Sequence, residues 1–171
     1  METIEVRRSI AAPIADVFDW ISNAGNYTDS PLFLAAKLIR SGSAAAYGAG
    51  AIRRFTFPFA VVHEEITRFD PPYSFSYRVI KCMPPVRHEG GAVVLTPTAQ
   101  GTDLMWSSSA ELRLPVFAAQ TTRAILPRLF GRAFSQVLDA AQSALEVNHG
   151  RASTARPSAS GPSRYPEREA R

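Results

Sequence analysis

The sequence predicts an α+β domain in which a curved antiparallel sheet of about seven strands closes around one long C-terminal helix. The stretch from Ala119 to Val147 is the only long amphipathic segment of the chain. Almost everything before Leu114 instead shows the patterns of strands. Consecutive short strands joined by tight turns imply antiparallel pairing. A strongly twisted sheet of this size can curl, and the long helix is the natural cover for its concave face.

The chain begins with one strand and two short helical segments. Alternating apolar and polar residues predict the first strand over residues 3–11. Pro13 ends this strand and suits the first turn of a helix, whose apolar stripe reaches Ile21. We expect residues 27–33 to form a second short helix or a turn.

Six consecutive strands follow, separated by turns rich in glycine and proline. Their expected ranges are 37–41, 51–59, 61–69, 73–81, 86–97 and 102–114. Asp70-Pro71-Pro72 is a strong turn signal, because proline fixes φ and cannot donate a hydrogen bond to a strand ladder. Gly90 and Gly91 indicate a bend or bulge within a strand.

The long helix carries its apolar residues on one stripe, at spacings of three and four. The stripe consists of Leu126, Phe130, Ala133, Phe134, Val137, Ala141 and Leu145. Pro127 and Gly131 are expected to bend or thin the early part of the helix. We therefore expect the wall and entrance of any cavity around Leu126, Phe130 and Phe134.

Length and charge predict one folded domain over residues 1–147 and a disordered basic tail over residues 148–171. The net charge is +4, but the tail alone contains five Arg and two Glu. The folded part is thus nearly neutral, and its charge does not indicate a nucleic-acid partner. The alternative for the tail is a basic arm that touches anionic surfaces.

The location of the protein is expected to be a reducing cytoplasm. The sequence has neither the basic start nor the apolar region of a secretory signal, and no apolar run of membrane-spanning length. A single cysteine, Cys82, leaves no internal disulfide framework. The protein is expected to lack an integral membrane segment and to be a monomer or a dimer.

Several pieces of sequence carry a resemblance through their order and spacing. They are Ala12-Pro13-Ile14-Ala15-Asp16-Val17-Phe18-Asp19-Trp20-Ile21 after the opening strand, Gly48-Ala49-Gly50, Glu64-Glu65-Ile66-Thr67-Arg68-Phe69-Asp70-Pro71-Pro72 followed by Phe75-Ser76-Tyr77-Arg78, Leu95-Thr96-Pro97 with Gly101-Thr102-Asp103-Leu104-Met105-Trp106, and the terminal helix. Together they resemble the helix-grip superfamily of START lipid-transfer domains, relatives of the birch pollen allergen and polyketide cyclase/dehydrase-like bacterial proteins. The resemblance covers about residues 3–147. It implies an elongated apolar cavity between sheet and helix and a hydrophobic ligand, but no particular reaction.

Aromatic and apolar residues dominate the expected inner face of the sheet. This face comprises Phe55, Phe57, Tyr77, Val79, Leu104 and Trp106. Such residues build pockets for small apolar molecules, although plain core packing explains about half of them equally well. The predicted ligand-binding residues are Tyr27, Arg53, Phe55, Phe57, Tyr77, Trp106, Phe130 and Phe134.

Arg53 shares a strand face with Phe55 and Phe57. If it points inward, its guanidinium would orient a carboxylate, an enolate or a carbonyl oxygen. We favour the alternative that Arg53 lies at the start of the strand and reaches solvent. Tyr27 is placed at the mouth of the cavity. Roles for Arg53 and Tyr27 rest only on analogy with cyclase-like members, which steer polyketide enolates with Arg and Tyr.

Neither a metal nor a cofactor is expected. His63 and Glu64 point to opposite faces of a strand, and the His-Glu-x-x-His spacing is absent. His88 is a candidate acid or base near neutral pH, but a surface or hydrogen-bonded histidine is the preferred interpretation. Cys82 is assigned no role.

The expected function is binding of a hydrophobic small molecule, lipid or polyketide-like, with no catalysis evident. The first alternative is a polyketide aromatase/cyclase that acts by positioning and general acid–base catalysis. In that case Arg53, Tyr27, Tyr77 and His88 would face the polyketide. The second alternative is a regulatory or interaction protein that uses its basic tail.

Overall fold

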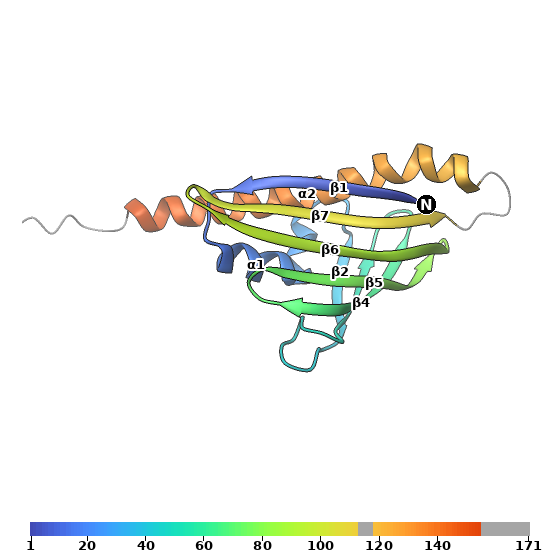
Figure 1. Cartoon of the computed structure of the whole chain (residues 1–171), viewed down its shortest axis with the longest axis horizontal. Helices are drawn as coiled ribbons and strands as arrows, with labels where there is room; N and C mark the ends of the chain where they lie inside the picture. Colours follow the sequence, from blue (N-terminus) through green and yellow to red (C-terminus); the bar gives the residue numbers. More distant parts are fainter. Residues whose placement is uncertain (113–117, 155–171) are drawn as a thin grey trace, which may run out of the picture.

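The computed structural model describes residues 1–112 and 118–154, and it confirms the predicted α+β helix-grip fold (Figure 1). One antiparallel sheet contains seven strands in the order β1-β7-β6-β5-β4-β3-β2. The strands are β1 (Glu2–Ile10), β2 (Ala35–Arg40), β3 (Ile52–Thr56), β4 (Val61–Asp70), β5 (Ser74–Met83), β6 (Val86–Thr98) and β7 (Gly101–Leu112). The helices are α1 (Ile14–Ser22), the 3₁₀ helix η1 (Ala24–Asp29) and α2 (Ala118–Thr154).

The two short helices follow β1. Pro13 holds the N-cap position of α1, and Val17, Phe18 and Ile21 are buried on its inner side. The side chain of Asn23 accepts a hydrogen bond from the backbone N–H of Gly25 and so starts η1. The second helical segment therefore begins earlier than the predicted residues 27–33, because Asn23 caps it.

The hairpin between β6 and β7 joins the sheet to the end of β1. Gly101 has a φ of 143°, and a Cβ atom there would lie 2.2 Å from the backbone oxygen of Ile10. Only glycine allows this close approach of two backbones. β7 then pairs with β1 along the whole of that strand, from Glu2 opposite Ala110 to Ile10 opposite Thr102.

Helix α2 runs along β1 and β7 (Figure 1). The predicted stripe is buried at Ala133, Phe134, Val137, Ala141 and Leu145, together with Leu138. The side chain of Leu126 lies outside the described residues. The helix continues to Thr154, beyond the amphipathic segment that the sequence pattern ended at Val147. The part of the predicted tail over residues 155–171 lies outside the described residues.

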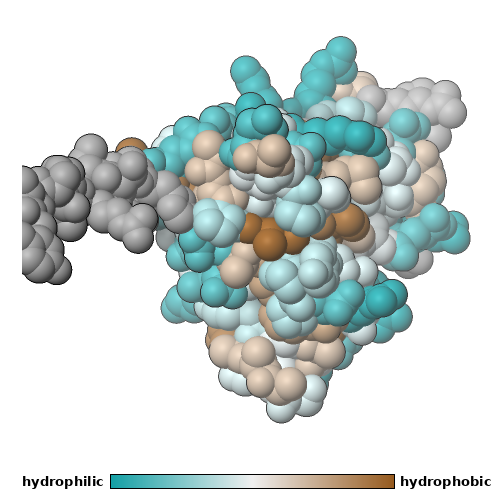
Figure 2. Space-filling view, turned by 60° about the vertical axis from the view of Figure 1, so that its left-hand side comes forward, coloured by the Kyte–Doolittle hydropathy of each residue, from teal (hydrophilic) through white to brown (hydrophobic). Residues whose placement is uncertain are grey.

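Most of the surface visible in Figure 2 is hydrophilic, with one small hydrophobic patch near its centre. Isolated apolar surface of this kind is common in folded proteins. Within residues 1–112 and 118–154, no helix is long and apolar enough to cross a membrane.

Candidate functional site: an aromatic cavity with a buried carboxylate

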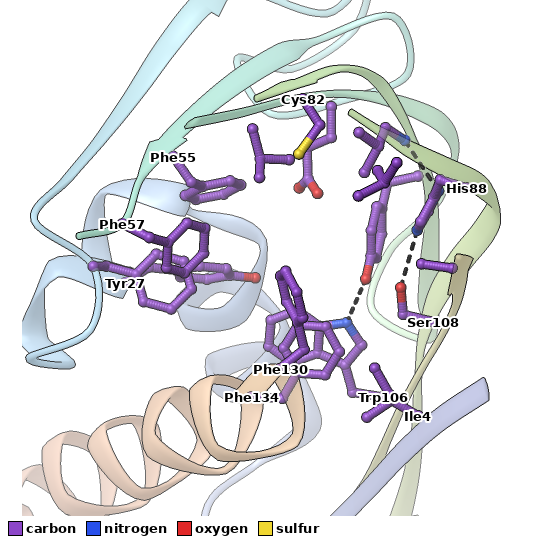
Figure 3. Close-up of a pocket in the computed structure, with 17 residues that line it drawn as sticks. Ile4, Tyr27, Phe55, Phe57, Cys82, His88, Trp106, Ser108, Phe130 and Phe134 are labelled. Atoms are coloured by element: carbon purple, nitrogen blue, oxygen red, sulfur yellow. Dashed lines mark hydrogen bonds between the residues drawn. The ribbon is translucent and has the colours of Figure 1, made fainter. Parts of the chain in front are cut away.

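A cavity of about 60 Å³ lies between the concave face of the sheet and α2 (Figure 3). Its wall is mainly aromatic, with contributions from Tyr27, Phe33, Phe55, Phe57, Tyr77, Trp106, Phe130 and Phe134. The polar groups in this wall belong to Glu64, His88 and Ser108, besides the tyrosine hydroxyls, the indole N–H of Trp106 and the thiol of Cys82. The volume exceeds the roughly 10–15 Å³ that one water molecule needs.

The structure places all of the predicted ligand-binding residues in this wall except Arg53. Val79 also lines the cavity, whereas Leu104 is buried in the core away from it. Tyr27 is 1% exposed and belongs to the inner wall, so its predicted place at the cavity mouth is wrong. The hydroxyl of Tyr27 donates a 2.9 Å hydrogen bond to the carbonyl of Ile21, and this bond ties η1 to α1.

Stacked rings join the sheet to the helices on two sides of the cavity. Trp106 of β7 stacks on Phe134 of α2, with ring centroids 4.2 Å apart. On the opposite side, Tyr27 of η1 stacks on Phe55 of β3 at 5.2 Å. Phe130 of α2 contacts Phe57 edge-on at 6.2 Å and so connects the two sides. Aromatic pairs contribute about 0.5–1.5 kcal/mol each beyond the area they bury.

Tyr77 reaches into the cavity because its strand partner is a glycine. Gly91 lies opposite Tyr77, and a Cβ atom on Gly91 would lie 2.2 Å from the tyrosine ring. The ring therefore lies flat across β6, where its hydroxyl accepts a 2.9 Å hydrogen bond from Nε1 of Trp106. Burial raises the pKa of Tyr77, so the hydroxyl keeps its proton at neutral pH.

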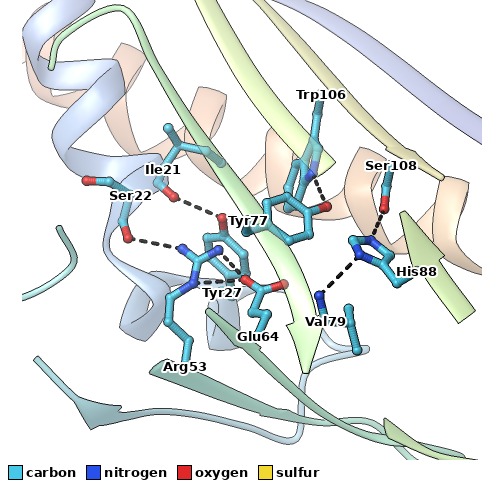
Figure 4. A network of polar contacts seen from close by, with 10 residues as sticks. All are labelled: Ile21, Ser22, Tyr27, Arg53, Glu64, Tyr77, Val79, His88, Trp106 and Ser108. Carbon is cyan, nitrogen blue, oxygen red and sulfur yellow. Dashed lines mark hydrogen bonds and ion pairs between the residues drawn. The ribbon is translucent and has the colours of Figure 1, made fainter. Parts of the chain in front are cut away.

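Arg53 is fully buried, so the preferred prediction that it reaches solvent is wrong. Its Nε donates a 2.9 Å hydrogen bond to Oε1 of Glu64, and its Nη2 also pairs with that oxygen (Figure 4). Its Nη1 donates to the backbone carbonyl of Ser22 at 3.3 Å. The rings of Tyr27 and Phe75 lie within cation–π distance of the guanidinium. Arg53 thus lies behind the cavity wall, and it is Glu64 that lines the cavity.

The buried pair determines the charge of Glu64. Burial raises the pKa of Glu64, and the neighbouring Arg53 opposes this shift. Burial, the largest single effect, lowers the pKa of Arg53, but the attraction and hydrogen bond of Glu64 together with the attraction of Tyr27 and Tyr77 make the net shift upward. An arginine stays protonated at physiological pH, and a buried cation needs an opposite charge. We therefore treat Glu64 as the carboxylate that neutralises Arg53.

Glu64 uses only one of its two oxygens in this pair. Both bonds from Arg53 end on Oε1. Among the described residues, no donor forms a hydrogen bond to Oε2, and Figure 4 shows that oxygen directed away from Arg53. A carboxylate oxygen has about two acceptor sites. The cavity therefore contains an acceptor without a protein partner.

His88 has a fixed tautomer. The backbone N–H of Val79 donates to its Nδ1 at 3.1 Å, so its proton lies on Nε2, which donates to Oγ of Ser108 at 3.0 Å. Burial lowers the pKa of His88 from 6.5 to about 4. A proton on Nδ1 would face the N–H of Val79, which also disfavours the charged form. The hydrogen-bonded interpretation is thus the right one for His88.

Among the described residues of the wall, ten were not among the predicted ligand-binding residues, namely Ile4, Phe33, Val62, Glu64, Val79, Cys82, Val86, His88, Ser108 and Ala110. Glu64 could have been found, because Val62, Glu64 and Ile66 alternate on one face of β4 and the turn before it pairs Glu64 with Arg53. The thiol of Cys82 has its pKa raised by burial. Over residues 1–112 and 118–154, no three metal-binding side chains lie together.

The sequence matches the model of a family described as polyketide cyclase/dehydrase and lipid transport, over residues 1–146. The chain belongs to this family. Among curated proteins, no sequence matches the chain significantly.

Solved structures with the fold of this family resemble the chain at low sequence identity. The Zhui aromatase/cyclase from Streptomyces sp. R1128 has a TM-score of 0.73 and 17% identity, over 86% of this chain and 95% of that one. The protein TTHA0849 from Thermus thermophilus has a TM-score of 0.71 and 15% identity, over 86% and 99%. A START superfamily protein from Mycobacterium smegmatis has a TM-score of 0.67 and 12% identity, over 85% and 98%. These likenesses show the fold that the family shares.

Proposed function

We propose that the protein binds a small hydrophobic molecule in the cavity between the sheet and α2. The observation that carries this proposal is a cavity of about 60 Å³ whose wall is mostly aromatic and contains few polar groups. Ligand sites for apolar molecules are built in this way. Membership in a family of cyclases and lipid transporters agrees with it.

Two groups on which a cyclase would depend are already engaged. The guanidinium of Arg53 is bound to Glu64 and Ser22. His88 accepts a hydrogen bond at Nδ1, and its pKa is about 4, so it is not a cationic acid at neutral pH. These contacts favour binding over polyketide cyclisation as the proposal.

The test uses the full chain. Native mass spectrometry after mild purification is expected to show a co-purifying hydrophobic molecule. Titration of the stripped protein with 2-methylnaphthalene should raise its free energy of unfolding by about 2.7 kcal/mol at a hundredfold excess over Kd. An interior that takes up neither a cellular ligand nor this probe would refute the proposal.

A further inference from the structure

One oxygen of Glu64 is a free hydrogen-bond acceptor of the cavity among the described residues. Oε2 of Glu64 is an acceptor with no partner among the described residues, within a mainly apolar wall. Oε1 is held by Arg53, so Glu64 cannot turn away without breaking two bonds to a buried cation. Oε2 is therefore fixed in place before any ligand arrives.

Two hydroxyls lie in the same wall, and each of them already accepts one hydrogen bond. The oxygen of Tyr77 accepts from Trp106, and the oxygen of Ser108 accepts from His88. Figure 4 shows Tyr77 and Ser108 on the side of Glu64 that is away from Arg53. An unpaired carboxylate oxygen in such a site is costly unless a ligand or water donates to it.

We propose that the ligand carries a hydroxyl group of an aromatic or alicyclic ring system, and that this hydroxyl donates to Oε2 of Glu64. The inference rests on the proposed function and specifies its ligand class. A hydrocarbon leaves Oε2 unpaired, and an ether or ketone places an acceptor against a carboxylate. A site built to bind a hydroxyl rejects an analogue without one, because its own polar group is then stranded.

Three probes of the same ring system separate the possibilities. They are 2-naphthol, which has a donor, 2-methylnaphthalene, which has the same shape without one, and 2-methoxynaphthalene, which only accepts. Calorimetry on the full chain should show that 2-naphthol binds at least tenfold more tightly than 2-methylnaphthalene and 2-methoxynaphthalene. The indole N–H signal of Trp106 should shift, since Trp106 lines the cavity.

Substitution tests the direction of the bond. Glu64→Gln replaces the acceptor with an amide that can also donate, so the preference for 2-naphthol should fall at least tenfold or reverse in favour of the methyl ether. Glu65→Gln is the matched control, because Glu65 is the next residue of β4 and does not line the cavity. If Glu64→Gln does not fold, the affinities of the wild-type protein for the three probes still test the inference.

Equal affinities for 2-naphthol and 2-methylnaphthalene would overturn the inference and leave the proposed function standing. Failure of all three probes to bind would overturn both.

The outer face of the sheet carries an independent feature, a row of basic residues. Lys37, Arg54, His63 and Lys81 are consecutive Cα partners across β2, β3, β4 and β5. Like charges directly opposite on neighbouring strands destabilise a sheet. Among the described residues, none of the three cations forms an ion pair, and Nε of Arg54 is buried without a hydrogen-bond partner. Lys37 opposite Arg54 is therefore an unfavourable pair for the sheet.

The residues on either side of this basic row indicate which kind of partner would bind the outer face of the sheet. Arg40 and Arg78 share the single carboxylate of Glu65. On the other side of the basic row, Val61 and Met83 are 36% and 67% exposed and pair with each other. Cations beside exposed apolar side chains suit a membrane interface, where the cations meet lipid phosphates and the apolar groups enter the headgroup boundary. Nucleic acid would leave the apolar groups unused.

We infer that the outer face of β2–β5 docks on a membrane surface rich in anionic phospholipid. The full chain should co-sediment with vesicles that contain phosphatidylserine and not with vesicles of phosphatidylcholine alone, and high salt should release it. The double substitution Lys37→Glu/Lys81→Glu should reduce binding at least tenfold. Arg151→Glu/Arg156→Glu makes the same charge change in the C-terminal segment and should preserve binding.

The inference is wrong if phosphatidylserine vesicles do not bind the chain, or if the Arg151→Glu/Arg156→Glu variant loses binding while Lys37→Glu/Lys81→Glu keeps it. Tighter, salt-sensitive binding to duplex DNA or RNA than to vesicles would also overturn it.

Discussion

Arg53 and Glu64 face each other across the hairpin of β3 and β4, and both are buried, one behind the wall of the cavity and one within it. The pair explains why a charged residue occurs beside Phe55 on the inward face of β3. It fixes the carboxylate that we infer to select the ligand.

Removing one partner of this pair should destabilise the fold strongly. Arg53→Met leaves the carboxylate of Glu64 buried without its cation, which costs about 3–5 kcal/mol. The double substitution Arg53→Met/Glu64→Leu should lose less than the sum of the single losses. Urea unfolding of the wild type, Arg53→Met, Glu64→Leu and the double variant measures the coupling energy between the two side chains. Single losses below about 1 kcal/mol would contradict a buried ion pair.

Stability should fall in mild acid because of His88. Its pKa is about 4 in the folded protein and 6.5 in the reference state. Above pH 6.5 both states are neutral, whereas between pH 6.5 and 4 only the unfolded state gains the proton. The full shift corresponds to roughly 3 kcal/mol, and we expect about 1–2 kcal/mol because His88 is only partly buried.

The measurement is urea unfolding at pH 7 and pH 4.5, with His88→Gln as the comparison. On acidification, the free energy of unfolding of the variant should fall by about 1–2 kcal/mol less than that of the wild type. Equal losses in both proteins would show that His88 is not the group responsible.

Gly91→Ala should displace the ring of Tyr77. The new Cβ atom would lie 2.2 Å from that ring, and such overpacking costs about 1–3 kcal/mol. The hydrogen bond from Trp106 to Tyr77 should weaken, which is visible in the indole N–H signal of Trp106.

Gly131→Ala in α2 is the matched control for Gly91→Ala. Its Cβ atom would have the ordinary distance of 3.9 Å from Ile4, so the higher helix propensity of alanine should stabilise the protein by up to about 1 kcal/mol. Equal effects of the two substitutions would contradict the close packing of Tyr77 on Gly91.

Phe134→Ala should enlarge the cavity. Loss of the ring that stacks on Trp106 should lower the free energy of unfolding by about 3–5 kcal/mol. Part of this loss should be regained when 2-methylnaphthalene fills the space. Phe18→Ala is the control, because Phe18 is also buried but packs on Phe69 and Phe75 outside the cavity. Its loss should not be regained, and recovery in both variants would mean that the probe acts elsewhere.

The order of the elements and most of the aromatic wall were predictable from local patterns. Alternation on β5 and β7 placed Tyr77 and Trp106 inward, and spacings of three and four placed Phe130 and Phe134 on the helix face that meets them. The charged members of the site were harder to predict. Alternation showed that Arg53 shares a face with Phe55, but an arginine on that face either reaches solvent or needs a buried partner.

The sequence by itself determined the fold class and the apolar face of each element, because these depend on periodicities that operate within one segment. Only the tertiary structure decided that Arg53 is bound by Glu64, that Tyr77 lies over Gly91 and that His88 holds a fixed tautomer. Each of these features depends on the register between strands, since a shift of one residue moves every side chain to the other face. The cavity and its unpaired acceptor thus result from pairing across the sheet.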